Sequence, residues 1–313
     1  MTTRHHRRSA ERKHREDIMT KAGVVGIGDM GSGLAKNLIA AGFETFGFDP
    51  AAARMQAFAD LGGKGCSDAA EVGRNADAVF VMVMTGAQAK EVIFGERGLL
   101  STMASGTIIV TATIKPSEML EIAEGLSGGN AALIDSPVSG GFPGAQGGTL
   151  TMMASGSDAA MATAKPVMEA VSASIHHVGT EPGQGQTVKA CLQSLLGAMF
   201  SATFEAAALA AKAGISGEAF YNVVASGSGG CTVTKSALEN IIDRKFEGTG
   251  SHIATMHKDL TISMALAQDL GVPMHTASAA MQIFHAGKTK YPDGDNWVCT
   301  RVIEEIVGAE LHR

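Results

Sequence analysis

The sequence contains few aromatic residues and few cysteines. Aromatic residues make up 5% of its 313 residues, whereas 39 are glycine and 45% are hydrophobic. This composition is typical of a protein of helices and sheets with tight backbone turns, and it argues against an all-β sandwich. The cysteines form no CxxC pair and have no histidine nearby at metal-ligand spacing, which argues against a disulfide framework or a zinc motif. We therefore expect reduced thiols in the core at Cys66, Cys191, Cys231 and Cys299.

Long apolar runs and a basic surface are also missing. The longest apolar stretches, such as 206–211, are far shorter than the ~20 residues needed to cross a bilayer. The formal net charge is −6, and much of the positive charge lies in residues 1–21, so the rest of the chain is distinctly acidic. An acidic body does not favour binding to the phosphates of nucleic acids. We expect a cytoplasmic protein that binds neither membrane nor nucleic acid.

Residues 1–20 have no apolar segment of the kind found in secretory signals. An arginine-rich start also occurs in organelle transit peptides, but the acidic residues Glu11, Glu16 and Asp17 and the lack of an amphipathic pattern weaken that alternative. We interpret this segment as a disordered basic leader, and a start codon misplaced upstream of Met19 is one explanation for it.

The remaining length suits two domains. We place a nucleotide-binding domain at residues 21–182 and an all-α domain for substrate binding and dimerisation at 183–313. The predicted fold class is α/β, with a Rossmann-type, doubly wound sheet followed by helices. Strands are expected at 22–25, 44–48, 78–84, 107–111 and 132–134, separated by helix-compatible segments such as 32–41, 87–93 and 117–126, and this alternation predicts a parallel sheet.

A glycine motif follows the first predicted strand and precedes a helix. A GxGxxG pattern alone is weak, but here the acidic Asp49 ends the next strand, 21 residues after the second glycine. This context is required for the dinucleotide fingerprint, in which the pyrophosphate lies at the helix N-terminus and the acid accepts hydrogen bonds from ribose. Asp49 would also repel the 2′-phosphate of NADP, so we expect NAD. The motif consists of Gly26, Ile27, Gly28, Asp29, Met30 and Gly31.

Other strands end at residues that should line the same crevice, because ligands bind beyond the carboxyl ends of such strands. These residues are found in the segments 84–86, 112–114 and 135–141. From residue 183 onward the sequence becomes rich in alanine and leucine, which predicts one long helix to about residue 212. Lys189 lies in its first two turns and Gln193 is at i+4, so both side chains lie on one face. Further helices are expected at 218–224, 234–243, 253–270 and 276–287.

Together these motifs resemble the β-hydroxyacid dehydrogenase family, which includes 3-hydroxyisobutyrate dehydrogenase, over residues ~22–310. Besides the glycine loop, the resemblance lies in Asp135-Ser136-Pro137-Val138-Ser139-Gly140-Gly141, which looks like the family's substrate loop. It also lies in Gly183-Gln184-Gly185 followed by Lys189, which looks like its catalytic signature, and in Lys258-Asp259-Leu260, which resembles a later family motif.

The resemblance implies a role for each matching residue. Lys189 would exchange the proton of the substrate hydroxyl while hydride passes to or from nicotinamide, and a partly desolvated amine suits that task. Ser139, Gly140, Gly141 and Gln193 would bind substrate, and the loop would offer hydroxyl and backbone N–H donors to a carboxylate. Thr85, Thr113 and Lys258 are expected to contact the cofactor. Pairing through the helical domain would give a homodimer or homotetramer.

Departures from the family pattern bear on the substrate. The family often has Asn-Asn where this chain has Leu192-Gln193, and Ser-Thr where it has Ala112-Thr113. Glutamine at this position resembles the branch that oxidises four-carbon sugar acids such as L-threonate at C2, as do the segments 88–96 and 148–156. Thr85 and Leu192 depart from that branch as well.

Several alternatives remain open from the residues. The enzyme could reduce 2-hydroxy-3-oxopropionate, or oxidise 3-hydroxyisobutyrate, with the same lysine. An imine reductase would share the architecture but usually lacks this lysine, and a nucleotide sensor would need no chemistry. No catalytic metal is expected, because the histidines form no HExxH or comparable cluster. The acidic pair Glu304-Glu305 is expected on a solvated surface rather than as paired catalytic acids.

Overall fold

A computed structural model describes residues 21–313. The predicted leader at 1–20 therefore lies outside the described residues. The chain forms two compact units. The first comprises the residues up to Ala112 together with Ser117–Gly185, and the second comprises Thr113–Pro116 and Gln186–Arg313. The short segment Thr113–Pro116 thus belongs with the second unit although it lies within the first half of the sequence.

The first unit contains one mixed sheet of nine strands in the order β3-β2-β1-β4-β5-β6-β8-β7, with β9 paired to β8. The strands from β3 to β6 pair in parallel, whereas β8 runs antiparallel to β6 and β7. The order reverses between β1 and β4, which is the switch point where doubly wound sheets bind ligands. The strands are β1 (Lys21–Val25), β2 (Glu44–Phe48), β3 (Lys64–Gly65), β4 (Ala78–Val81), β5 (Gly106–Val110), β6 (Ala131–Asp135), β7 (Val138–Ser139), β8 (Leu150–Ser155) and β9 (Ser172–Gly179).

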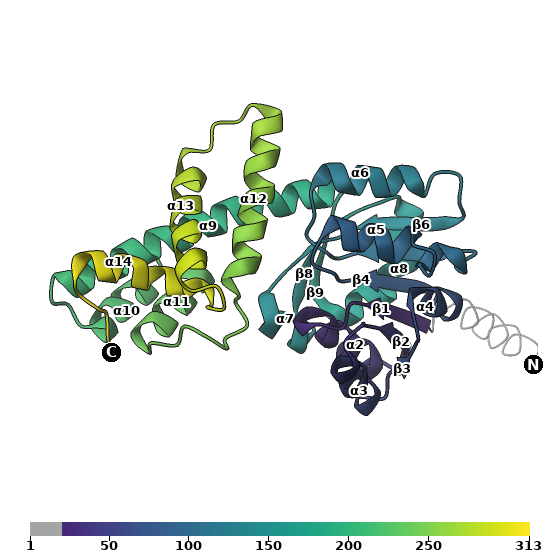
Figure 1. Cartoon of the computed structure of the whole chain (residues 1–313), viewed down its shortest axis with the longest axis horizontal. Coiled ribbons are helices and arrows are strands. Elements are labelled where there is room, and N and C mark those ends of the chain that lie inside the picture. The colour runs from purple at the N-terminus through teal and green to yellow at the C-terminus, as the bar shows by residue number, and fades with distance from the viewer. Residues whose placement is uncertain (1–20) are drawn as a thin grey trace, which may run out of the picture. The chain divides into compact units, whose positions relative to one another are not determined.

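Helices cover both faces of this sheet, with α2 and α3 on one side and α5 and α6 on the other (Figure 1). This arrangement confirms the predicted doubly wound fold. The helices of the first unit are α2 (Asp29–Ala40), α3 (Ala52–Asp60), α4 (Ala69–Asn75), α5 (Gly86–Phe94), α6 (Pro116–Gly125), α7 (Gly141–Gly147) and α8 (Asp158–Val171).

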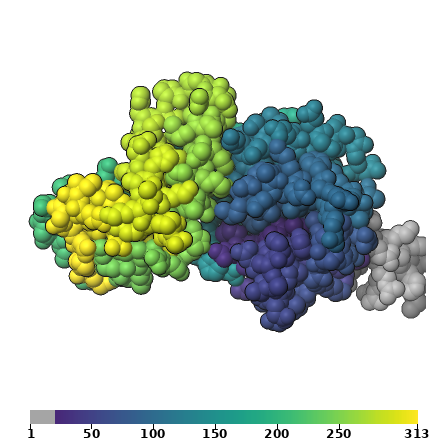
Figure 2. Space-filling view, viewed as in Figure 1, coloured from purple at the N-terminus to yellow at the C-terminus, as the bar shows by residue number. Residues whose placement is uncertain are grey.

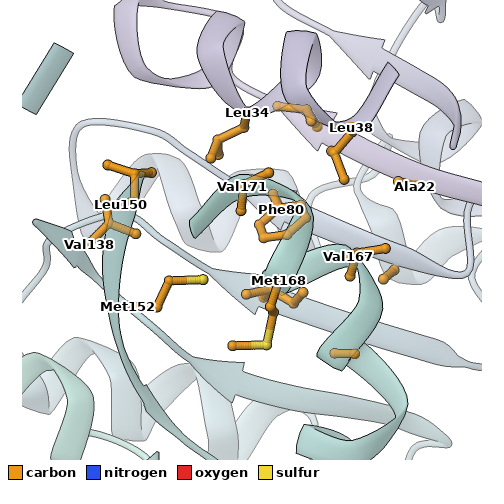
Figure 3. Close-up of a cluster of buried hydrophobic side chains, with 14 of the residues drawn as sticks. Ala22, Leu34, Leu38, Phe80, Val138, Leu150, Met152, Val167, Met168 and Val171 are labelled. Atoms are coloured by element: carbon orange, nitrogen blue, oxygen red, sulfur yellow. The ribbon is translucent and has the colours of Figure 1, made fainter. Parts of the chain in front are cut away.

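The core of the first unit lies under α2 and α8. Leu34 and Leu38, one turn apart on α2, are fully buried with Phe80 of β4 and with Val167 and Val171 of α8 (Figure 3). The spacing of the two leucines places both on one helical face, as the sequence predicted. This packing fixes the glycine loop that precedes α2 against the sheet.

The second unit is built from helices, and its described residues contain no strand, as predicted. The helices are α9 (Gln184–Lys212), α10 (Gly217–Ser226), α11 (Thr232–Ile242), α12 (Ile253–Leu270), α13 (His275–Lys290) and α14 (Cys299–Val307). Its core is an aromatic cluster in which the Phe200 ring lies 6.1 Å from that of Phe204 and 5.6 Å from that of Trp297. Aromatic pairs at such distances contribute packing beyond their buried area.

The helix α9 is long and apolar enough to cross a membrane, by length and composition alone. The search for short apolar runs in the sequence missed this property because polar residues interrupt the helix. Phe200, Phe204 and Ala207 of α9 are buried in the core of the second unit. We therefore interpret α9 as a core helix, since core helices of globular proteins pass the same test.

Within the second unit, α12 and α13 pack side by side, and their connecting turn protrudes in light green in Figure 2. The turn follows Gly271, which adopts the left-handed conformation that ends α12. Leu270 and Val272 beside it are 66% and 50% exposed. Apolar side chains therefore face solvent at this tip.

Expectations about the cysteines are partly wrong. All four are free thiols, and Cys66 and Cys299 are buried, where burial raises the pKa of Cys66 to about 11 and that of Cys299 to about 12. Cys191 is exposed and Cys231 is partly exposed, so neither is a core thiol. Cys191 is on α9 and Cys231 caps α11, and a composition argument cannot distinguish such positions from core positions.

The expectation of a solvated Glu304-Glu305 pair is wrong for Glu304. The two side chains do lie on different faces of α14, but Glu304 is only 2% exposed. Its carboxylate accepts hydrogen bonds from Arg244 at 2.7 Å and from the backbone N–H of Leu311 at 3.0 Å. Glu305 is exposed and pairs with Lys290 and Tyr291. Glu304 thus connects Leu311, near the end of the chain, to Arg244, which follows α11.

We predict that Glu304→Gln lowers the free energy of unfolding by about 1–3 kcal/mol, because the amide removes the buried charge that Arg244 faces and leaves it only the more exposed Glu310, at 3.4 Å. The matched change Glu305→Gln should have little effect, since that ion pair is exposed to solvent. Chemical denaturation of both variants measures the difference. Equal losses in the two variants would show that burial of Glu304 contributes nothing.

Candidate active site

The glycine loop connects β1 to α2 in a conformation that requires glycine. Gly26 has φ of +92°, and a Cβ there would lie 2.2 Å from the carbonyl oxygen of Met82. A Cβ at Gly31 would lie 1.8 Å from the carbonyl oxygen of Gly26. Both contacts are with backbone atoms that cannot move aside, so these two glycines maintain the close approach of loop and helix.

Gly28 differs because the space beside it is open. Its φ is −76°, and the nearest atoms to a Cβ there would belong to the guanidinium of Arg54, at 3.7 Å or more. Gly28 is also the N-cap of α2, and no side chain caps the first turn of that helix. The backbone N–H groups of a helix start attract an anion, so the loop fits the pyrophosphate of a dinucleotide.

Asp49 directly follows β2 and is only 4% exposed. Its carboxylate accepts hydrogen bonds from the backbone N–H of Ile27 at 2.9 Å and of Ala51 at 2.9 Å. The acid predicted to bind ribose therefore also fastens the glycine loop to the end of β2. Arg54 of α3 lies 3.4 Å from the same carboxylate, a neighbour that the sequence search did not single out.

Two further predicted positions follow strands of the same sheet. Thr85 follows β4 and is exposed, and its hydroxyl accepts a hydrogen bond from the N–H of Gln88 at the start of α5. Ser139 ends β7, and the exposed Gly140 and Gly141 follow it with φ of +130° and +59°. A non-glycine residue rarely adopts these angles, so the loop needs both glycines. Thr85 thus has a capping role whether or not it binds cofactor.

The Gly-Gln-Gly signature is held by the sheet of the first unit. Asp135, which is 1% exposed at the end of β6, accepts hydrogen bonds from the N–H of Gly183 at 2.9 Å and from the hydroxyl of Ser155 at 3.2 Å. Ser155 in turn accepts from the N–H of Gly185 at 3.1 Å. A Cβ at Gly185 would lie 2.5 Å from the carbonyl oxygen of Met153. These contacts fix the first turn of α9, and sequence reasoning did not assign them to Asp135 and Ser155.

Lys189 lies within the first two turns of α9 in the second unit and is 6% exposed. Burial lowers the pKa of its amine, because removal from water disfavours the charged form. The negative charge of Asp259 raises the pKa and the positive charge of Lys258 lowers it, and both effects are smaller than that of burial. An amine whose pKa is lowered in this way can accept a proton nearer to neutral pH than an exposed lysine can.

Gln193, one turn after Lys189, is also 6% exposed. Its Nε2 donates a hydrogen bond to Oδ2 of Asp259 at 2.6 Å. The other oxygen of Asp259 lies 3.0 Å from Nζ of Lys258. The predicted side chains at 189, 193 and 258 are therefore linked electrostatically through one carboxylate on α12, a residue of the Lys258-Asp259-Leu260 motif for which no role was predicted.

The segment around Thr113 completes this cluster within the second unit. Lys258 donates a hydrogen bond to the carbonyl oxygen of Thr113 at 2.6 Å. The fully buried side chain of Gln186 accepts from the N–H of Ile114 at 3.0 Å. Thr113 and Lys258 were both predicted to contact the cofactor. The structure joins them through the backbone carbonyl of Thr113.

The histidines are less scattered than the sequence suggested. Nε2 of His257 on α12 lies 2.8 Å from Nδ1 of His285 on α13, and Lys288 lies 3.5 Å from the His257 ring. Within the part of the chain that the structure describes, no three His, Cys, Asp or Glu side chains are grouped as metal ligands. His176 and His177 lie on β9, and adjacent strand residues face opposite ways.

Comparison with known proteins identifies both units. Residues 21–179 match the NAD-binding domain of 6-phosphogluconate dehydrogenase, and residues 183–303 match a domain described as NAD-binding of NADP-dependent 3-hydroxyisobutyrate dehydrogenase. An L-threonate dehydrogenase of Escherichia coli strain K12 is 38% identical over 91% of this chain and 95% of its own length. The chain belongs to the β-hydroxyacid dehydrogenase family.

Other family members agree with this assignment. A 2-(hydroxymethyl)glutarate dehydrogenase of Eubacterium barkeri is 30% identical over 86% of this chain and 89% of its own. The crystal structure of a 3-hydroxyisobutyrate dehydrogenase from Salmonella typhimurium has a TM-score of 0.83 and 32% identity, covering 90% of this chain and 99% of that one. This β-hydroxyacid dehydrogenase is thus a nicotinamide-dependent oxidoreductase, and the predicted α/β fold with a helical second half is confirmed.

Substitutions at Gly28 and Gly31 of the cofactor loop should separate the affinity for NADH from the stability of the fold. Gly31→Ala should lower the free energy of unfolding by about 1–3 kcal/mol, because its Cβ collides with backbone. Gly28→Ala should cost less than about 1 kcal/mol yet weaken NADH binding by roughly tenfold or more, because its Cβ occupies the space that a pyrophosphate needs.

Thermal unfolding without cofactor and titration of NADH fluorescence measure the two effects. Wild-type affinity for NADH in Gly28→Ala would contradict the placement of the pyrophosphate at this loop.

Proposed function

We propose that this dehydrogenase oxidises a small polyhydroxylated acid, such as L-threonate, with NAD, and that Lys189 is the general base. The burial of Lys189 beside a carboxylate is the observation that carries the proposal, because the lowered pKa of its amine suits proton exchange with an alcohol. The similarity of the chain to L-threonate dehydrogenases supports the choice of a four-carbon sugar acid.

In the proposed reaction the O–H bond and a C–H bond of the carbinol break as the carbonyl double bond forms. The amine of Lys189 accepts the hydroxyl proton, and in the reverse direction the ammonium returns it. When bound, the nicotinamide supplies the hydride acceptor, which takes the hydrogen with both electrons of the C–H bond. The hydroxyl of Ser139 and the backbone N–H groups of Gly140 and Gly141 are proposed to hold the substrate carboxylate.

We propose NAD as the preferred cofactor because of Asp49. Its buried carboxylate would accept hydrogen bonds from ribose hydroxyls and repel a 2′-phosphate. Arg54 lies 3.4 Å from this carboxylate and offsets part of its charge, so we expect a preference for NAD rather than complete exclusion of NADP. Thr85, Thr113 and Lys258 are proposed to contact the cofactor at the other end.

We also propose that the enzyme works in the cytoplasm as a homodimer or homotetramer and that small molecules are its only ligands. The resemblance to the family supports self-association through the second unit, and the large apolar side chains exposed there are candidates for the contact surface. Among them Leu209 is 71% exposed, Val223 is 68% exposed and Ile306 is 81% exposed.

The direct test follows the absorbance of NADH with purified protein offered L-threonate, D-threonate, erythronate, 3-hydroxyisobutyrate or glycerate, with NAD or NADP. We predict the highest kcat/KM for L-threonate with NAD, and a loss of about 10²–10⁴-fold in Lys189→Met, because the base is absent. Lys165→Met, at an exposed position of α8, serves as the matched control and should retain full activity.

The same panel separates the alternatives. Turnover of 3-hydroxyisobutyrate alone would assign the enzyme to the 3-hydroxyisobutyrate dehydrogenase branch of the family. If Lys189→Met bound NADH normally and retained full turnover with each active substrate, Lys189 would not be the base.

A further inference from the structure

Two histidines join neighbouring helices of the second unit. His257 lies on α12 and His285 on α13, and these two helices pack side by side (Figure 1). Their ring centroids are 4.8 Å apart, and Nε2 of His257 lies 2.8 Å from Nδ1 of His285. The rings therefore share a hydrogen bond that links α12 to α13, and neither ring takes part in the proposed reaction.

The ammonium of Lys288 determines which ring nitrogens carry protons. Its Nζ lies 3.5 Å from Nδ1 of His257, and an ammonium can only donate, so this nitrogen is an acceptor without a proton. A neutral imidazole has one N–H, so Nε2 of His257 carries it and donates to Nδ1 of His285. Lys288 thus donates to His257, which donates to His285. This chain of hydrogen bonds exists only while both imidazoles are neutral.

Protonation of either imidazole breaks the chain. A second proton on His257 would be on Nδ1 and face the ammonium of Lys288, whereas a second proton on His285 would be on Nδ1 and face the N–H of His257. Both cases place two donors against each other. They also add a positive charge beside Lys288, and like charges at such short range repel.

No carboxylate among the described residues offsets these charges at His257. The charges that act on its ring come from the ammonium and the second imidazole, both on α13. On the other side of α12, Asp259 interacts with Lys189 of α9 instead. The short helix η2 (Asn296–Val298), which also packs on α12, contains no charged residue. An additional positive charge on this pair therefore has no counter-charge.

The same surroundings favour the neutral form of His257. Burial, and to a smaller extent the charges of Lys288 and His285, lower the pKa of the His257 ring. In the unfolded chain an imidazole takes up a proton near about pH 6.5. The neutral ring thus contributes stability to the folded protein above that pH, and this contribution is lost as the pH falls through the lowered pKa.

We propose that the hydrogen bond between His257 and His285 is a pH-sensitive contact that holds α13 against α12 while both rings are neutral and weakens in mild acid. Lys258 and Asp259 follow His257 directly on α12, so the contact acts on the helix that carries the polar side chains around Lys189. Acidification therefore loosens a helix pair next to the candidate active site without titrating the proposed base.

The test replaces both histidines by glutamine, because an amide accepts from Lys288 through its oxygen and donates through its nitrogen but does not titrate. Melting temperatures of the wild type and of His257→Gln/His285→Gln are measured at about pH 8 and about pH 5.5, on either side of the ordinary histidine pKa. The melting temperature of the wild type should fall between these pH values by roughly 2–4 °C more than that of the double variant. His275→Gln makes the same change at an exposed position of α13 and should keep the wild-type pH dependence.

NMR of isotope-labelled histidine side chains tests the chain of hydrogen bonds in the wild type, with the signals assigned from the single variants. In mildly alkaline solution both rings should carry their proton on Nε2. A proton on Nδ1 of either ring would overturn the inference, and this result does not require the double variant to fold. An equal fall in melting temperature in the wild type and the double variant would also overturn it. Both measurements are made without substrate, so failure of the proposed dehydrogenase activity would leave this inference standing.

Discussion

The carboxylate of Asp259 organises the polar side chains around Lys189 in the second unit. One oxygen receives the amide of Gln193, the other faces the ammonium of Lys258, and its charge opposes the effect of burial on Lys189. Without this acid, the buried Lys189 would lose a negative charge that favours its charged form, and Lys258 would lose the carboxylate 3.0 Å away. The protonation of the proposed base and the orientation of the Gln193 amide therefore depend on the same side chain.

Buried carboxylates have a similar role elsewhere in the chain. Asp49 holds the N–H of Ile27 in the cofactor loop, and Asp135 holds the N–H of Gly183 before the helix that carries Lys189. Asp295 in the second unit accepts from both the N–H and the hydroxyl of Thr249. In each case a hydrogen bond to the carboxylate fixes a loop that has few side chains available for packing. Functional loops are thus positioned by acids at strand or helix ends rather than by their own apolar contacts.

Local patterns predicted much of this architecture. Five of the six strands from β3 to β6 and the long α9 helix were visible, because buried strands are apolar runs and helices repeat every 3.6 residues. The strands β8 and β9 were missed, since no residue of β9 is fully buried and β8 contains methionine and alanine with only one β-branched residue, Thr151. The candidate site was predicted as single residues from motifs. The hydrogen bonds between these residues were not predicted. The contact of Gln193 with Asp259, for example, joins positions 66 residues apart, and no local spacing in the sequence reveals it.

The most direct measurement of the central claim is the pH dependence of kcat/KM for oxidation in wild-type enzyme and in Asp259→Asn. A lowered pKa for Lys189 means that the unprotonated base forms below the pH at which an ordinary lysine loses its proton, so the rate should rise with pH and level off before pH ~10. Since the charge of Asp259 raises that pKa, Asp259→Asn should shift the rise to lower pH, and Lys189→Met should abolish it. A rise that stays at the same pH in Asp259→Asn, or that persists in Lys189→Met, would show that Lys189 is not the titrating base.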